Sequence, residues 1–198
     1  MGDSNGMYFL HFINELIAPI CTLLAGYIGV RYGLKQIIEQ KRVDFVERQL
    51  REFYSPIIGF RKEIQAKSAL RLRISNAANE AWQEFCATKS HPFEDHDKEF
   101  EPYRKTIEYD NAQLENELMP LYEKMLKTFS ENYWLADPET AKWYPKLCDF
   151  VELWRRWLLR NIPSDVIKKI DASENQLLPF YDELENRLAI LKKALKGK

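Results

Sequence analysis

An uncharged apolar stretch near the amino terminus limits the folds open to this chain more than any other feature. Between Met7 and Val30, seventeen of twenty-four residues are apolar, and residues 16–30 contain no charged side chain. A helix over residues 8–30 would be about 34 Å long, enough to cross the roughly 30 Å hydrocarbon core of a bilayer. The alternative is a buried helix of a soluble protein, but this stretch lacks the polar face that such a helix normally carries.

The residues that flank this stretch predict its orientation in a membrane. No Lys or Arg occurs among residues 1–30, whereas the following residues include Arg31, Lys35, Lys41 and Arg42. Because Lys and Arg collect on the cytoplasmic side of membrane helices, we expect the amino terminus to lie outside. The expected organisation is a short extracytoplasmic tail (1–7), a transmembrane helix (8–32) and a cytoplasmic domain (33–198), in a membrane such as the bacterial inner membrane. The four bases would also contact anionic lipid headgroups.

Two further features of the apolar stretch bear on function. Ala25, Gly29 and Gly33 recur every four residues and form a face of small side chains, which lets transmembrane helices approach closely and self-associate. Glycine is also simply common in membrane helices, so the face alone does not establish an oligomer. Glu15 is either a functional carboxylate within the membrane or a residue of the outer headgroup region, and the second interpretation is favoured.

The rest of the sequence predicts an all-α fold. The chain has only seven glycines, and apolar residues recur at helical spacing. We expect a bundle of four to five helices, in which Ser55-Pro56 interrupts the helix that continues from the membrane. Asp137-Pro138-Glu139 is typical of a helix start, with a capping carboxylate, a proline at the first position and an acid in the first turn. The predicted helices cover about residues 34–55, 56–88, 103–134, 137–160 and 177–195, with a polar loop at 90–102.

The last predicted helix has apolar residues at alternating spacings of four and three. The residues are Leu177, Tyr181, Leu184, Leu188, Leu191 and Leu195. This spacing suits either a coiled coil or packing within an antiparallel bundle, and the run is short enough that the second is the commoner use. Residues 117–125 (ELMPLYEKM) and 176–184 (QLLPFYDEL) also resemble each other. They represent either a duplicated hairpin or two helices that accommodate a proline and a tyrosine in the same way.

The sequence shows no catalytic motif for nucleotide binding, hydrolysis or metalloprotease activity. His91 and His96 stand among four acidic residues, but their spacing matches no common metal frame, so we expect an exposed loop and no metal or cofactor. Cys86 and Cys148 lie in helical patterns and are expected to be inert thiols. Trp154-Arg-Arg-Trp157 could contact lipid or nucleic acid, but helical spacing favours packed tryptophans with the arginines turned outward. We therefore expect no nucleic-acid partner.

These observations predict a membrane-anchored helical interaction or scaffold module that holds a protein partner at the cytoplasmic membrane face. We do not expect it to be an enzyme. The module is also a candidate homo-oligomer. An oligomeric membrane-active effector is the alternative, in which the glycine-faced transmembrane helix forms a pore or leak pathway controlled by the bundle. An enzyme with a helical-bundle site around His91 and His96 is a third hypothesis.

Overall fold

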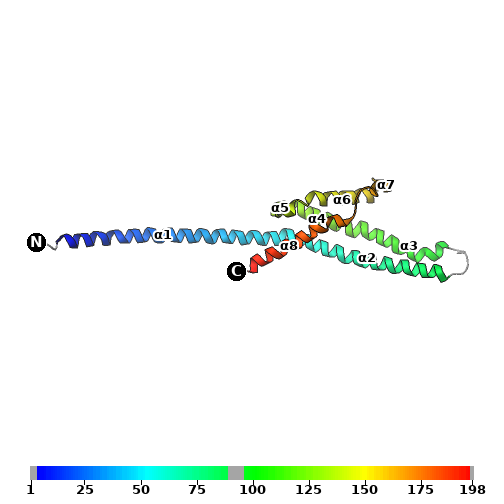
Figure 1. The fold of residues 1–198 in the computed structure, drawn as a ribbon, viewed down its shortest axis with the longest axis horizontal. Helices are drawn as coiled ribbons and strands as arrows, with labels where there is room; N and C mark the ends of the chain where they lie inside the picture. Colours follow the sequence, from blue (N-terminus) through cyan, green and yellow to red (C-terminus); the bar gives the residue numbers. More distant parts are fainter. Residues whose placement is uncertain (1–3, 89–95, 197–198) are drawn as a thin grey trace. The chain divides into compact units, whose positions relative to one another are not determined.

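The computed structural model describes the backbone of residues 4–88 and 96–196, and the side chains of residues 22–24, 26–88, 98–163 and 165–196. All regular secondary structure in this part of the chain is helical (Figure 1), which confirms the all-α prediction. The chain divides into two compact units, residues 1–47 and residues 48–198.

The first unit is built from one long helix, α1 (Ser4–Arg48). Large apolar side chains between Leu23 and Phe45 are exposed along it. In the part of the chain that the structure describes, no helix combines the length and the apolar character needed to cross a membrane. The side chains of residues 8–21, which belong to the predicted membrane segment, lie outside the described residues.

The second unit begins with a wide, π-helical turn, η1 (Gln49–Tyr54), which leads directly into α2 (Ser55–Thr88). The predicted interruption at Ser55-Pro56 is therefore wrong. A proline ring normally clashes with the carbonyl four residues earlier. Here the N–H of Ser55 bonds to the carbonyl of Leu50, five residues back, and this wider turn makes room for the ring without ending the helix.

The same device recurs before a second proline. A π-helical turn, η2 (Leu114–Leu118), joins α3 (His96–Gln113) to α4 (Met119–Glu131), and the N–H of Met119 bonds to the carbonyl of Leu114 just before Pro120. The α3 helix also starts earlier than predicted and includes Pro102. Its first turns are held against α2 by aromatic contacts, because the rings of Phe100 and Tyr103 each lie 5.1 Å from that of Trp82.

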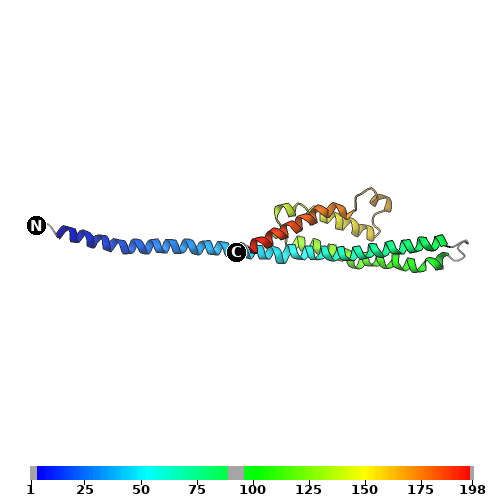
Figure 2. The same ribbon diagram turned by 60° about the horizontal axis from the view of Figure 1, so that its bottom comes forward.

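The remaining elements complete a helical bundle around α2 and α4 (Figures 1 and 2). They are η3 (Tyr133–Leu135), α5 (Pro138–Ala141), α6 (Tyr144–Leu158), α7 (Ser164–Ile167), η4 (Glu174–Leu177) and α8 (Leu178–Lys196). The predicted helix over 137–160 is thus two helices, α5 and α6. Its predicted start is confirmed, since the carboxylate of Asp137 accepts the N–H of Glu139 at 3.3 Å. Helix α6 packs on α4, while α8 packs on η1, α2 and α5.

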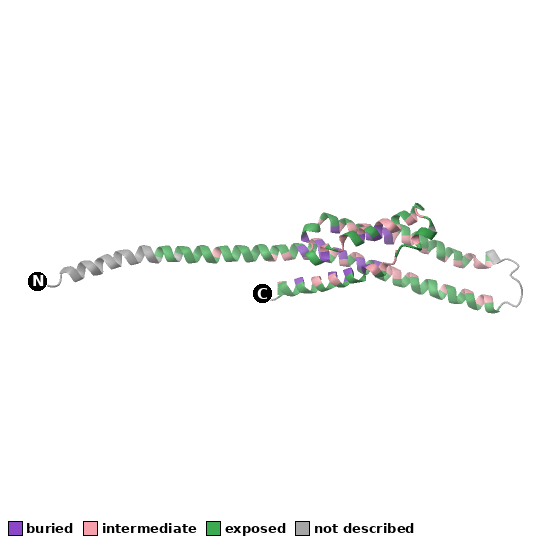
Figure 3. Cartoon of the chain, turned by 45° about the horizontal axis from the view of Figure 1, so that its top comes forward, coloured by how far each residue is buried: buried purple, intermediate pink, exposed green. Residues whose placement is uncertain are grey.

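The buried residues concentrate where η1 and the first turns of α2 meet α4, α6 and α8 (Figure 3). Phe129 is fully buried, and its ring centroid lies 5.0 Å from that of Phe53, 5.2 Å from Tyr144 and 5.9 Å from Phe180. This aromatic core draws one residue from each of four elements, η1, α4, α6 and α8. It therefore fixes how these elements pack, and it sets the framework for the polar clusters described next.

Candidate functional site

Three helical segments of the bundle share one pattern, Leu-x-x-(Phe/Leu)-Tyr. The segments are QLREFY (49–54), ELMPLY (117–122) and QLLPFY (176–181). In each segment the tyrosine and the residue before it are buried. The sequence resemblance between the second and third segments was recognised above, whereas the first was missed, although its Leu-x-x-Phe-Tyr spacing equals that of the third. The pattern marks places where a helix brings a tyrosine hydroxyl into the bundle interior.

Tyr122 and Tyr181 meet at one carboxylate. Both hydroxyl groups donate to Oε1 of Glu174, at 2.7 Å and 3.1 Å. The guanidinium of Arg61 donates to the same oxygen at 2.6 Å and lies over the Tyr181 ring, 4.0 Å from its centroid. We call Arg61, Tyr122, Glu174 and Tyr181 the tyrosine cluster. It joins α2, α4, η4 and α8 at a single acceptor atom.

Local sequence places Glu174 where these donors can reach it. Ser173 caps η4, because its hydroxyl accepts the N–H of Asn175 at 3.1 Å. The carboxylate of Asp171 in turn accepts the N–H of Ser173 at 2.9 Å. These two capping bonds fix the turn in which Glu174 stands, so the cluster does not depend on a flexible loop.

Burial and charge determine the protonation of this cluster. Burial raises the pKa of Tyr122 well above its ordinary value, and the negative charge of Glu174 adds to this effect. The pKa of Tyr181 is raised by the same two causes, burial first. Both hydroxyls therefore stay protonated and act as donors at neutral pH. Arg61 is almost fully buried, and its Nε has no hydrogen-bond partner among the described residues.

A second polar cluster surrounds the third tyrosine. The hydroxyl of Tyr54 lies 3.1 Å from Oγ1 of Thr140 and accepts the backbone N–H of Asp137 at 3.1 Å. Oγ1 of Thr140 donates to Glu183 at 3.3 Å, and Arg187 forms an ion pair with Asp137. Burial raises the pKa of Tyr54. This cluster ties η1 to α5 and α8, beside the point where the second unit begins.

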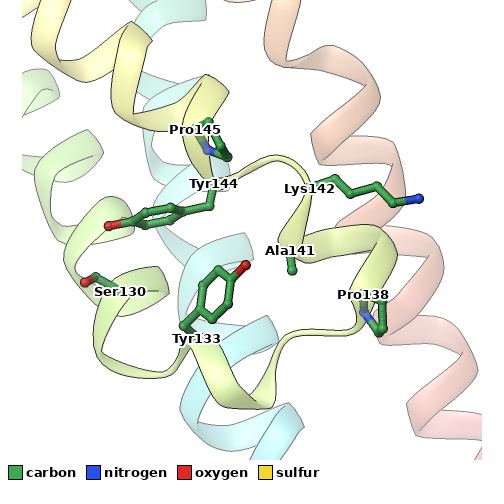
Figure 4. A pocket seen from close by; sticks show the side chains of 7 residues that line it. All are labelled: Ser130, Tyr133, Pro138, Ala141, Lys142, Tyr144 and Pro145. Carbon is green, nitrogen blue, oxygen red and sulfur yellow. The ribbon is translucent and has the colours of Figure 1, made fainter.

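The surface close to this cluster carries an open depression of about 680 Å³ (Figure 4). The lining residues are Ser130, Tyr133, Pro138, Ala141, Lys142, Tyr144 and Pro145. The rings of Tyr133 and Tyr144 meet edge to face, with centroids 5.6 Å apart. The next residue after Tyr133 is the exposed Trp134. The guanidinium of Arg48 lies over the Trp134 ring, 4.6 Å from the ring centroid. Exposed aromatic side chains of this kind are enriched where proteins bind other proteins.

The residues singled out from sequence do not come together in one place. Arg31, Lys35, Lys41 and Arg42 are exposed on α1, as is Gly29, and Gly33 is half-buried. The side chains of Glu15 and Ala25, and those of His91 and His96, lie outside the described residues. Among the described residues, no group of three His, Cys, Asp or Glu side chains is arranged to hold a metal ion.

The other predicted contacts lie within the bundle. Leu177, Leu184 and Leu191 are buried there, and Leu188 and Leu195 are half-buried, so the apolar spacing of α8 serves packing inside this chain. Trp154 and Trp157 are half-buried. The arginines between them are exposed, and each of them pairs with Glu152. The indole N–H of Trp154 donates to the carbonyl of Ala172 at 3.0 Å, which holds the segment before η4 against α6.

Comparison of the chain with protein-family models, with curated proteins and with solved structures found no match.

Proposed function

We propose that this protein is a membrane-anchored helical module, in which residues 8–32 cross the bilayer and the bundle holds a protein partner at the cytoplasmic face. One observation carries the proposal: the described part of α1 leaves its apolar side chains exposed. Leu23 and Val30, for example, are 74% and 64% exposed. Each square ångström of apolar surface left in water costs about 25 cal/mol, so such a helix is stabilised by an apolar environment.

The charges that follow the apolar stretch support a membrane as that environment. Arg31, Lys35, Lys41 and Arg42 are exposed on α1 immediately after it. Long basic side chains at the end of a membrane helix can extend to the headgroups while the helix stays inserted. Their position on the carboxyl-terminal side supports a bundle on the cytoplasmic side.

The bundle supports the interaction part of the proposal. Its interior is filled by packed apolar residues, by the tyrosine cluster and by the second polar cluster around Tyr54. The depression around Tyr133 and Tyr144 is open to solvent. A rigid scaffold with an exposed aromatic surface suits the binding of another protein better than a flexible chain does, because less side-chain freedom is lost on binding. The depression is therefore the first candidate for the surface that binds the partner.

A second candidate function is an oligomeric effector whose α1 helices form a pore or leak pathway. It is favoured by the open space at Gly29 and Gly33 of the small-residue face, where an added Cβ atom would meet nothing within 4 Å apart from the adjoining residues and the backbone of its own helix. Close approach of helices at small residues is the usual basis of such assemblies. Only the second candidate requires contact between copies at the face of Ala25, Gly29 and Gly33, and a cross-linking pattern along α1 tests for that contact.

The anchor is tested by alkaline carbonate extraction of the full chain and of the double variant Leu24→Glu/Ile28→Glu. An acidic residue costs up to about 2.5–3.5 kcal/mol of insertion free energy at the centre of a membrane helix. Leu24 and Ile28 lie in the carboxyl-terminal half of residues 8–32, and the two charges together should weaken insertion, so we expect the wild-type chain in the membrane pellet and the variant in the supernatant. Leu70→Glu/Ile74→Glu is the matched control, because these α2 side chains are also exposed. The control should stay in the pellet. Extraction of the wild-type chain by carbonate would refute the anchor.

A further inference from the structure

Large apolar residues of α1 recur at alternating spacings of four and three along most of its length. The residues are Phe9, Ile13, Leu16, Ile20, Leu23, Tyr27, Val30, Leu34 and Ile37, which we call the α1 seam. The seam extends over four heptads, with Tyr27 and Leu34 at a positions and Val30 and Ile37 at d positions. A spacing of this kind sustained over three to four heptads is the pattern of a coiled coil.

The seam differs from every other column of the same helix. Each of the other five heptad positions is interrupted by a polar or charged residue, a glycine or a proline. Over residues 9–37 these residues are His11 at f, Asn14 and Lys35 at b, Glu15 and Gln36 at c, Arg31 at e, and Pro19, Gly26 and Gly33 at g. An apolar stretch with no preferred face would interrupt the a and d columns as often as the others. The seam is therefore a surface of its own and not a by-product of general apolarity.

The described members of the seam are all exposed. Their exposed fractions range from 54% at Ile37 to 74% at Leu23, and Tyr27, Val30 and Leu34 fall between these values. The side chains of the first four members lie outside the described residues. Lipid chains would cover an apolar surface anywhere around the helix, so lipid gives no reason for a repeat of 3.5 residues. A second helix with the same repeat does explain the 3.5-residue spacing, because supercoiling keeps the two seams in contact along their length.

We propose that two copies of this chain pair in parallel and in register through the α1 seam. In-register pairing places each apolar seam residue opposite itself. Parallel pairing also keeps the two cytoplasmic bundles on the same side of the membrane. The next a and d positions are Lys41 and Asp44, so the contact ends after Ile37, since like charges would otherwise face each other. Gly26, next to the a position Tyr27, leaves room for close approach of the partner helix.

This inference deepens the proposed function by naming a second copy as a partner, and it assigns the contact to a face other than that of Ala25, Gly29 and Gly33. At about 100° per residue, positions 25 and 29 lie about 120° or more around the helix from the middle of the seam. The two faces can therefore be told apart by experiment. The coiled coil would form in water as well as in lipid, so it does not fail if the membrane anchor fails.

The test is disulfide cross-linking of the full chain in membranes. Single cysteines are introduced one at a time at positions 22–37, after Cys21, Cys86 and Cys148 are each replaced by serine. We expect dimer formation to peak at positions 23, 27, 30, 34 and 37, several-fold above positions 25, 29, 32 and 36. Peaks at 25, 29 and 33 would overturn the proposal in favour of the small-residue face and the pore. Equal cross-linking at all positions, or none, would overturn it as well.

A second pair of variants controls for effects of the introduced cysteines on pairing. Leu34→Glu places a charge on the seam, whereas Gln36→Glu places the same charge two residues away and off the seam. In the background that carries Val30→Cys, we expect Leu34→Glu to reduce cross-linking several-fold and Gln36→Glu to leave it unchanged. Equal effects of the two substitutions would contradict the seam. Carbonate extraction of the same variants shows separately whether the anchor is intact.

Discussion

Replacing Glu174 with alanine is expected to lower the free energy of unfolding of the bundle by about 3 kcal/mol, since it leaves a buried arginine without its counter-charge. Arg61 is nearly fully buried, and the two tyrosine hydroxyls would lose their acceptor together with it. Glu174 itself is partly exposed, which places the effect at the low end of the range for broken buried pairs. For a domain of this size the loss corresponds to a drop of roughly 6–12 °C in Tm.

Tryptophan fluorescence during urea unfolding measures this effect in the full chain. All five tryptophans belong to residues 48–198, so the signal reports on the bundle and not on α1. Glu185→Ala is the matched control, because Glu185 pairs with Lys62 and both side chains are more than half exposed. Such a pair contributes about 0.5 kcal/mol or less. Equal losses for Glu174→Ala and Glu185→Ala would contradict the role given to the tyrosine cluster.

Alkaline pH is expected to destabilise the bundle through its buried tyrosines. The pKa values of Tyr122 and Tyr181 are raised in the folded chain, mainly by burial, so the folded state keeps protons that the unfolded state releases near pH 10. Their contribution to stability is thus fully present below about pH 10 and is lost as the pH rises further. Each tyrosine adds up to about 1.4 kcal/mol per pH unit to that slope, so the pair adds up to about 2.7 kcal/mol per unit once the pH is well above 10.

The double variant Tyr122→Phe/Tyr181→Phe isolates this effect. It is less stable at neutral pH, because Glu174 loses two hydrogen-bond donors, but its free energy of unfolding should fall much less steeply between pH 10 and 11 than that of the wild type. Tyr109→Phe is the control, since Tyr109 is mostly exposed. It should reproduce the wild-type slope. Parallel curves for the wild type and the double variant would show that the two hydroxyls are not held as protonated donors.

Periodicity in the sequence predicted the class of the bundle but not its continuity at prolines. The apolar spacing of α8 and the capping residues at Asp137 are local signals, and both led to helices where the structure has them. Ser55-Pro56 predicts a break, because proline disfavours helix at the preceding residue. The structure keeps the helix through a π-helical turn whose Phe53 and Tyr54 are fully buried. The helix continues through Ser55-Pro56 because of tertiary packing, which a local sequence pattern cannot predict.

The tyrosine cluster was only half visible in the sequence. The resemblance of residues 117–125 and 176–184 marked two tyrosines at equivalent positions, but it did not show that they share an acceptor. Glu174 lies 113 residues from Arg61 and 52 residues from Tyr122 in the chain, so their contact exists only after the bundle forms. The depression around Tyr133 and Tyr144 was missed for a different reason. Its residues are close in the chain, between Ser130 and Pro145, but they come from four elements, α4, η3, α5 and α6, and from the turn before α6, and a local pattern does not give the arrangement of these elements.

The most direct test of the membrane-anchored module is the accessibility of two cysteines to a membrane-impermeant maleimide in bacterial spheroplasts. Ser4→Cys and Arg73→Cys are introduced separately into the full chain after the three native cysteines are replaced by serine. The account predicts that Ser4→Cys is labelled in intact spheroplasts and that Arg73→Cys is labelled only after lysis. If Ser4→Cys also requires lysis, or if Arg73→Cys is labelled in intact spheroplasts, residues 8–32 do not cross the membrane in the proposed orientation.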